Sequence, residues 1–223
     1  MHNDMIKQFN LNLFDTKQDD KQVTYKSIVL PSDEFVSCGE VIIYPDFFSQ
    51  LESDLFFLEL LNGIKWQQDK IKIFGKEVNL PRLTAWYGDI GKSYTYSGIT
   101  MNPDHWSSIL LLIKKRIEAV VKVNFNSVLA NLYRNGQDYV SWHSDDEKEL
   151  GKNPTIASIS FGATRRFLLR HKSNKDLKTV DLSLCHGSLL IMRGSTQHYW
   201  KHRVPKTAKV NTERINLTFR VIY

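Results

Sequence analysis

Six stretches of alternating apolar and polar residues in the C-terminal half constrain the fold most strongly. After Lys122 the apolar period changes to two, which is typical of strands whose side chains point alternately to two faces. Turn sequences such as Asn135-Gly136 and His186-Gly187 separate several of these stretches. Because helices precede the strands instead of alternating with them, the pattern predicts an antiparallel barrel or jelly roll. The predicted strands are 127–133, 155–161, 165–171, 178–184, 187–192 and 213–223.

Two amphipathic helices are predicted ahead of these strands. Between Tyr44 and Trp66, apolar residues recur at steps of three and four, and Gly63 is a plausible end. A second helix is predicted to open at Asn102-Pro103, since proline is tolerated in a first helical turn. We expect both helices to be packing elements. Their apolar faces are Phe48, Leu51, Leu55, Leu58 and Leu61 in the first, and Trp106, Ile109, Leu110, Ile113, Ile117 and Val120 in the second.

Composition limits the class of protein. A chain of 223 residues fits one domain, here 26–223, behind a loose charged arm over 1–25. Cys38 and Cys185 cannot form a disulfide framework, and their number is typical of a reducing compartment. No signal peptide or membrane-length apolar run is visible. We therefore expect a soluble intracellular monomer without a membrane partner, cytoplasmic in a bacterium or nuclear in a eukaryote. The net charge of +6 favours capture of a polyanion such as nucleic acid.

A candidate metal motif lies at His143-Ser144-Asp145. In an extended chain, side chains at positions i and i+2 point the same way and can hold one ion. The third ligand could be His198 or His202. Two imidazoles and one carboxylate leave open positions, which suits iron(II) that must bind a cosubstrate and oxygen. A His-x-Asp triplet is short, and an ordinary surface turn is the alternative interpretation.

The last predicted strand carries a second candidate constellation. One face is apolar and the other is polar, so the polar face is either solvated or directed into a site. Two arginines six residues apart lie roughly 20 Å apart on a straight strand, so one small diacid would need both long side chains to reach it. Arginine suits this role because its guanidinium binds a carboxylate through two parallel hydrogen bonds. The apolar face is Ile215, Leu217, Phe219 and Val221, and the polar face is Arg214, Asn216, Thr218 and Arg220.

Taken together, these motifs resemble the AlkB family of alkylation-repair dioxygenases, most closely its branch that repairs duplex DNA. The resemblance runs from about Pro81 to Val221. It is carried by the order of several motifs more than by any one of them. The motifs are Pro81–Asp89, Tyr94–Gly98, Asn131–Gly136, His143–Glu147, Ile156–Gly162, His186–Leu190, His202–Pro205 and Arg214–Arg220.

The resemblance implies a double-stranded β-helix with an N-terminal nucleotide-recognition lid at roughly 70–100. It implies iron(II) held by His143, Asp145 and His202, where His202 is preferred to His198 because Arg-Val-Pro follows it. The implied cosubstrates are 2-oxoglutarate and O2. Two arginines would neutralise the 2-oxoglutarate carboxylates while neighbouring polar residues line the same pocket. The implied 2-oxoglutarate residues are Asn131, Tyr133, Arg214, Asn216, Thr218 and Arg220.

The implied reaction is oxidative demethylation of base nitrogens in DNA, in lesions such as 1-methyladenine and 3-methylcytosine. Hydroxylation of the methyl carbon gives a hemiaminal, which releases formaldehyde, alongside succinate and CO2. A base in a duplex must first be extruded from the stack. Tyr94 and Tyr96 match the recognition segment, and Glu147 could accept from an exocyclic amine. Phe74 matches an apolar finger that could fill the vacated stack.

Basic residues are further candidates for substrate contact. Arg82 could contact phosphates, as could the cluster Arg165, Arg166, Arg170 and Lys172. Each substrate residue also has an ordinary structural interpretation: tyrosines and phenylalanine as packing residues, charges as a solvated face. Three functions remain open: a DNA demethylase, a related oxygenase acting on RNA, protein or a small molecule, and a non-catalytic binder. The complete ligand set disfavours the binder, and the charge favours nucleic acid without separating DNA from RNA.

Overall fold

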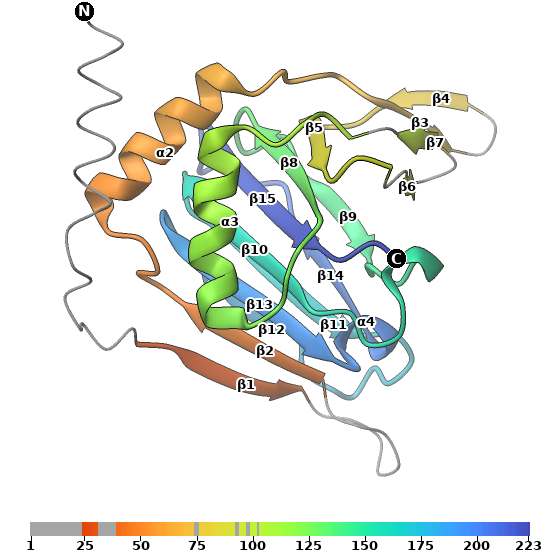
Figure 1. Cartoon of the computed structure of the whole chain (residues 1–223). Coiled ribbons are helices and arrows are strands. Elements are labelled where there is room, and N and C mark those ends of the chain that lie inside the picture. Colours follow the sequence, from red (N-terminus) through yellow and green to blue (C-terminus); the bar gives the residue numbers. More distant parts are fainter. Residues whose placement is uncertain (1–23, 31–38, 74–75, 92–93, 97–98, 102) are drawn as a thin grey trace, which may run out of the picture.

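The protein is described here by a computed structural model covering residues 24–30, 39–73, 76–91, 94–96, 99–101 and 103–223 (Figure 1). Two antiparallel sheets face each other. The larger has seven strands in the order β1 (Lys26–Leu30), β2 (Gly39–Tyr44), β13 (Ser188–Gly194), β10 (Ile156–Gly162), β15 (Arg214–Arg220), β8 (Ser127–Tyr133) and β5 (Leu83–Gly88). The smaller has four in the order β12 (Val180–Leu184), β11 (Arg165–His171), β14 (Trp200–Val204) and β9 (Val140–His143).

The winding of the chain from β8 to β15 is that of a jelly roll. Successive strands pass between the larger and the smaller sheet, except that β11 and β12 are neighbours in the smaller one. The predicted fold class is therefore confirmed. The winding pairs strands that are far apart in sequence, such as β10 with β15 and β14 with β9, so residues from distant segments meet between the sheets.

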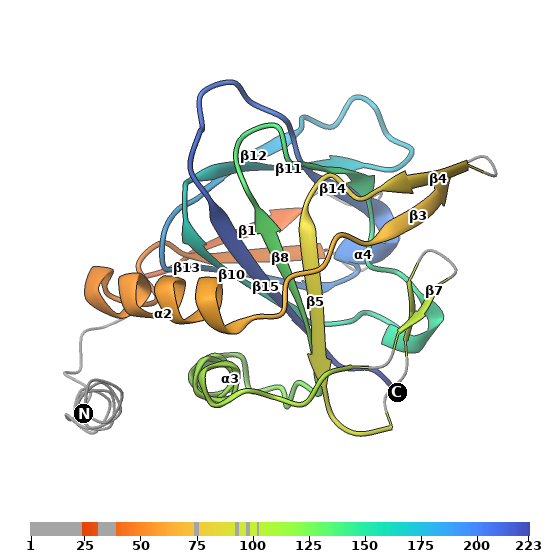
Figure 2. The same cartoon turned by 90° about the horizontal axis from the view of Figure 1, so that it is seen from above.

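Helices α2 (Gln50–Gly63) and α3 (Ser108–Val121) cover the outer face of the larger sheet, as Figures 1 and 2 show. The first helix begins after Ser49, whose side chain forms a capping box with Glu52, and it ends at the expected Gly63. Its predicted buried face was wrong in part. Leu51 and Leu58 are 57% and 54% exposed, whereas the helix packs on the sheet through residues that the predicted pattern did not include. These buried residues are Ser53, Phe56 and Leu60.

The start of α3 also differs from the prediction. The helix begins at Ser108 behind the Ser107 cap, whose hydroxyl accepts from the Leu110 amide. A serine hydroxyl satisfies an amide at a helix start, and Pro103 therefore lies in the preceding segment. The predicted apolar face is largely confirmed, since Leu110, Ile113 and Ile117 are buried, while Val120 is exposed at the end of the helix.

The predicted strands are found, and two of them match residue for residue, at 127–133 and 165–171. Several strands were missed, of which β14 matters most because it carries His202. Trp200, His202 and Val204 of this strand are buried, while Lys201 and Arg203 between them are only half-buried. The period is two, but a histidine occupies an apolar position and hides the pattern.

Two small hairpins lie on the side of β5 away from α2 (Figures 1 and 2). They are β3 (Lys70–Ile73) with β4 (Lys76–Asn79), and β6 (Tyr94–Tyr96) with β7 (Ile99–Met101). The apolar finger residue Phe74, residues 1–23 of the predicted N-terminal arm (1–25) and Cys38 lie outside the described residues. Of the helices in the described ranges, none combines the length and the hydropathy that a membrane span requires.

Arg165 is buried in the jelly roll, so its predicted contact with phosphate was wrong. It is 2% exposed, and its guanidinium donates to the carbonyl oxygens of Asn135 at 3.1 Å and of Asp138 and Pro205 at 2.8 Å each. The side chain therefore joins the loop after β8 to the end of β14. Neighbouring Arg166 is exposed and pairs with Asp181 at 2.6 Å.

We predict that Arg165→Met lowers the free energy of unfolding by about 3 kcal/mol, because three carbonyl oxygens at least partly shielded from water lose their donor. Arg166→Met, one residue away on the exposed face, serves as the matched control and should change stability little. Urea unfolding followed by circular dichroism would measure both. Equal stability of the two variants would contradict a structural role for Arg165.

Candidate active site

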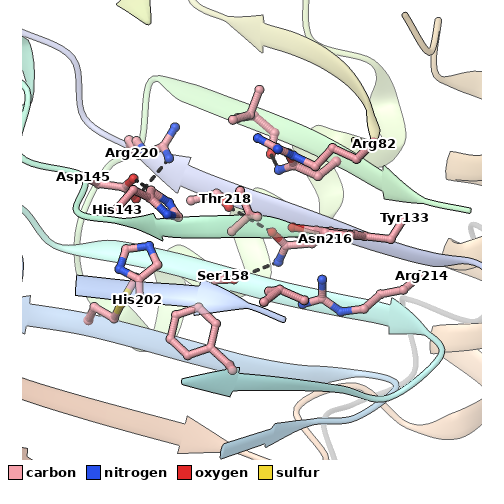
Figure 3. Close-up of a pocket in the computed structure, with 16 residues that line it drawn as sticks. Arg82, Tyr133, His143, Asp145, Ser158, His202, Arg214, Asn216, Thr218 and Arg220 are labelled. Atoms are coloured by element: carbon pink, nitrogen blue, oxygen red, sulfur yellow. Dashed lines mark hydrogen bonds and ion pairs between the residues drawn. The ribbon is translucent and has the colours of Figure 1, made fainter. Parts of the chain in front are cut away.

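His143, Asp145 and His202 meet between the sheets. His143 ends β9 and lies directly opposite His202 of β14 in the strand register, and Asp145 follows two residues later. Their ligand atoms all lie within 4.8 Å of one another. Figure 3 shows the three side chains gathered at one end of a pocket. The competing candidate, His198, is exposed and accepts from the Asn153 amide, so it is not part of this cluster.

Both imidazoles are prepared to donate a lone pair. His143 Nδ1 lies 2.9 Å from the Ser141 carbonyl oxygen. A carbonyl oxygen only accepts, so Nδ1 carries the hydrogen and Nε2 is left for a metal. Burial, and then the charge of His143, lowers the pKa of His202 to about 3. His202 is therefore neutral at physiological pH, the form that binds metals.

The Asp145 carboxylate is buried and ionised. Burial raises its pKa, but the charge of Arg220 and the hydrogen bond from it outweigh that effect and hold the pKa below its ordinary value. Its Oδ2 atom accepts from Arg220 Nη2 at 3.0 Å. Its Oδ1 atom is buried without a hydrogen-bond partner and lies 3.6 Å from His143 Nε2. An unsatisfied carboxylate oxygen facing two imidazoles fits a divalent cation, and the donor set fits iron(II).

A short helix holds the backbone of Asp145 in place. Gln197 lies in α4 (Thr196–Tyr199), is fully buried, and accepts from the Asp145 amide through Oε1 at 3.0 Å. Its Nε2 atom lies 3.4 Å from Met192 Sδ. The sequence did not predict a role for Gln197, because this residue belongs to no motif. Its closeness to His202 is the one signal that could have drawn attention to it.

The polar face of β15 looks into the pocket. The apolar residues Ile215, Leu217 and Phe219 pack in the core beneath the helices, and the alternate residues face the smaller sheet. The strand is thus buried on both faces rather than solvated on one. The residues lining the pocket are Arg82, Leu129, Asn131, Tyr133, Val140, His143, Asp145, Ser158, Phe167, Met192, His202, Val204, Arg214, Asn216, Thr218 and Arg220.

The two arginines of β15 occupy opposite ends of the pocket (Figure 3). Arg220 is bound to Asp145, whereas Arg214 lies beside Tyr133, with its guanidinium 5.0 Å from the ring centre. Arg214 Nη2 donates to Ser160 Oγ at 2.9 Å, while its Nε and Nη1 atoms make no hydrogen bond. Burial lowers its pKa. A buried guanidinium that pairs with no carboxylate of the described chain is a site for an incoming carboxylate.

Polar residues between the two ends form a connected row. Asn216 donates from Nδ2 to Ser158 Oγ at 2.8 Å and to the Ile159 carbonyl at 3.0 Å. Thr218 Oγ1 donates to Asn216 Oδ1 at 3.1 Å. Ser158 and Ser160 of β10 were missed in the sequence. Their alternation with Ile159 is visible there, but the register that places them beside Thr218 and Asn216 is not.

The predicted substrate residues are only partly described. Tyr94 and Tyr96 alternate on β6, opposite Met101 and Ile99 of β7, and the positions of their side chains lie outside the described part. Glu147 is half-buried, two residues after Asp145, at the start of a short 3-10 helix, η1 (Lys148–Leu150).

The predicted basic contacts fall into two groups. Arg82 is 3% exposed and lines the pocket, so it does not lie on an outer surface where phosphates would reach it. Arg170 lies over the Trp142 ring at 4.3 Å, and Lys172 pairs with Asp146 at 2.7 Å. Arg166, Arg170 and Lys172 are exposed on the outer side of the smaller sheet, where phosphates could reach them.

Comparisons with known proteins agree with this geometry. The profile of the 2OG-Fe(II) oxygenase superfamily matches residues 40–220. The chain is 44% identical to human alpha-ketoglutarate-dependent dioxygenase alkB homolog 3 over 212 residues, covering 92% of this chain and 72% of that protein. It is 41% identical to bovine DNA oxidative demethylase ALKBH2 over 198 residues, covering 85% of this chain and 70% of that protein.

A solved structure of OsALKBH1 has the same fold, with a TM-score of 0.58 at 17% identity, covering 81% of this chain and 96% of the other. At this identity the similarity concerns the fold alone. The family match and the two groups of relatives indicate the chemistry more specifically than the shared fold does. This chain belongs to the 2OG-Fe(II) oxygenase superfamily and, within it, to the AlkB family of 2-oxoglutarate-dependent dioxygenases.

Proposed function

We propose that this protein is a DNA oxidative demethylase that removes methyl groups from base nitrogens. One pocket carries the proposal. In it, an unsatisfied oxygen of Asp145 faces two imidazoles, and the buried Arg214 guanidinium pairs with no carboxylate of the described chain. The relatives named DNA oxidative demethylase, at 36% to 41% identity, support DNA as the substrate.

The proposed reaction oxidises a methyl group and then loses it. When bound, iron(II) with 2-oxoglutarate and O2 would supply the oxidation: one oxygen atom would enter the methyl C–H bond and the other would enter succinate as CO2 leaves. The resulting N–CH2–OH group then collapses. Its O–H proton departs, the C–N bond breaks with its electron pair moving to the base, and formaldehyde is released.

The protein residues bind and orient the reactants. His143, Asp145 and His202 hold the metal, and Arg220 keeps the Asp145 carboxylate ionised and correctly turned. Arg214, with the Tyr133 hydroxyl, would bind the carboxylate of 2-oxoglutarate furthest from the metal, because it lies at the opposite end of the pocket. The remaining polar residues would bind along the cosubstrate between these ends. They are Asn131, Asn216 and Thr218.

The substrate would enter from the side of the two hairpins. We propose residues 70–100 as a nucleotide-recognition lid, with Tyr94 and Tyr96 stacking on the extruded base and Glu147 accepting from its exocyclic amine. Arg166, Arg170 and Lys172 would contact phosphates. The net charge of +6 supports this capture of a polyanion.

Asp145→Ala should lower turnover at least about 100-fold, because the metal loses its only carboxylate ligand. Asp146→Ala removes the adjacent carboxylate, which is exposed and pairs with Lys172, and should retain most activity. Iron(II) affinity and formaldehyde release would be measured for both variants. Near-normal iron binding in Asp145→Ala would show that the metal site lies elsewhere.

Arg214→Met should raise the KM for 2-oxoglutarate about 10- to 100-fold, since one charged hydrogen-bonded contact is worth about 1.5–3 kcal/mol. Iron(II) affinity should remain unchanged, because Arg214 lies at the far end of the pocket. Arg166→Met again serves as a control on the outer surface. An unchanged KM in Arg214→Met would contradict its role at the distal carboxylate.

The function itself is tested with oligonucleotides that carry 1-methyladenine or 3-methylcytosine. Single-stranded DNA, duplex DNA and RNA would each be incubated with iron(II), 2-oxoglutarate and O2. We expect formaldehyde and the unmodified base from DNA in equal amounts. Restoration of RNA alone would favour the alternative of an RNA demethylase, and succinate formed without base restoration would point to a protein or small-molecule substrate.

A further inference from the structure

Arg82 is an arginine inside the pocket that the roles above leave unused. It lies immediately before β5, is almost fully buried, and lines the same pocket as the metal triad. The backbone around it is fixed by Gln68, whose Nε2 atom donates to the carbonyl oxygens of Leu80 at 2.5 Å and of Arg82 at 3.3 Å. The backbone that carries the Arg82 side chain is therefore held in place.

The Arg82 side chain determines which way the Asn131 amide points. Arg82 Nε lies 2.6 Å from Asn131 Oδ1, a short charge-assisted hydrogen bond. An amide oxygen and nitrogen are hard to distinguish by shape alone, but a guanidinium can only donate. The Asn131 oxygen must therefore face Arg82, and its Nδ2 group, 3.5 Å from the Leu129 carbonyl, keeps donor capacity for a ligand in the pocket.

The pocket also carries an excess of positive charge. Its lining contains Arg82, Arg214 and Arg220 but a single carboxylate, Asp145, which is bound to Arg220. Neither Arg82 nor Arg214 forms an ion pair within the described chain. Buried charges without counter-ions are costly, so the free energy favours an anionic ligand in this pocket. A dianion such as 2-oxoglutarate supplies two negative charges.

We propose that Arg82 is a positioning residue for 2-oxoglutarate. It turns the donor end of the Asn131 amide toward a cosubstrate carboxylate, and it adds a positive charge to the pocket. This assignment replaces a contact between Arg82 and DNA phosphate. It rests on the proposed function, because it requires that 2-oxoglutarate binds in this pocket.

The test measures the Kd of 2-oxoglutarate for the iron(II)-loaded protein without oxygen, through the visible charge-transfer absorption that forms on binding. Arg82→Met should raise this Kd about tenfold, as expected for loss of one charge-assisted contact. Arg82→Lys keeps the charge but loses the planar guanidinium, so its Kd should lie between those of the wild type and Arg82→Met. In an Asn131→Ala background, Arg82→Met should have a much smaller effect, because the residue it positions is already absent.

Iron(II) affinity and the thermal unfolding midpoint are measured on the same variants, with Lys115→Met on the exposed side of α3 as the outer-surface control. The proposal expects the Kd to rise in Arg82→Met while iron(II) affinity stays as in the wild type. An unchanged Kd would overturn it, as would a loss confined to the KM for the methylated oligonucleotide. Equal effects of Arg82→Met with and without Asn131 would also overturn the positioning role. If the wild type itself bound no 2-oxoglutarate, the proposed function would fail.

Discussion

The ionised carboxylate of Asp145, buried between Arg220 and two imidazoles, is the interaction on which the site depends. Burial alone would favour the protonated form, and only the neighbouring positive charge keeps the group ionised. Arg220 satisfies one oxygen and leaves the other for the metal. Because β15 also carries Arg214 at its other end, one strand supplies both the partner of the metal ligand and the candidate anchor of the cosubstrate.

The jelly roll makes this arrangement possible through strand pairing. β14 pairs with β9, which brings His202 opposite His143, and β15 pairs with β8 and β10, which brings its polar face beside Tyr133 and the serines. Helices α2 and α3 cover the face of the larger sheet that points away from the pocket (Figure 2). The apolar side of each central strand therefore serves the core, and the polar side is free to bind ligands.

The sequence predicted most of the C-terminal strands, the His143/Asp145 pair and the polar face of β15, because each is encoded locally as a period or a motif, whereas the choice of His202 over His198 came from the resemblance to the AlkB family. It did not predict β14 as a strand, since His202 occupies an apolar position in its pattern. It also did not predict roles for Gln197, Ser158 or Ser160, which arise from contacts between segments that are distant in the sequence. Arg82 and Arg165 were assigned to the surface because charge alone does not reveal burial; both proved to be buried and bonded to distant segments.

The central claim is that one pocket binds iron(II) through two histidines and one carboxylate while holding 2-oxoglutarate beside it. X-ray absorption at the iron edge tests this claim most directly, on the iron(II)-loaded protein with and without 2-oxoglutarate and without oxygen. The account predicts one iron per chain with two imidazole nitrogens, and oxygen ligands that change when 2-oxoglutarate is added. An iron environment without imidazole scattering, or one that 2-oxoglutarate does not alter, would contradict it.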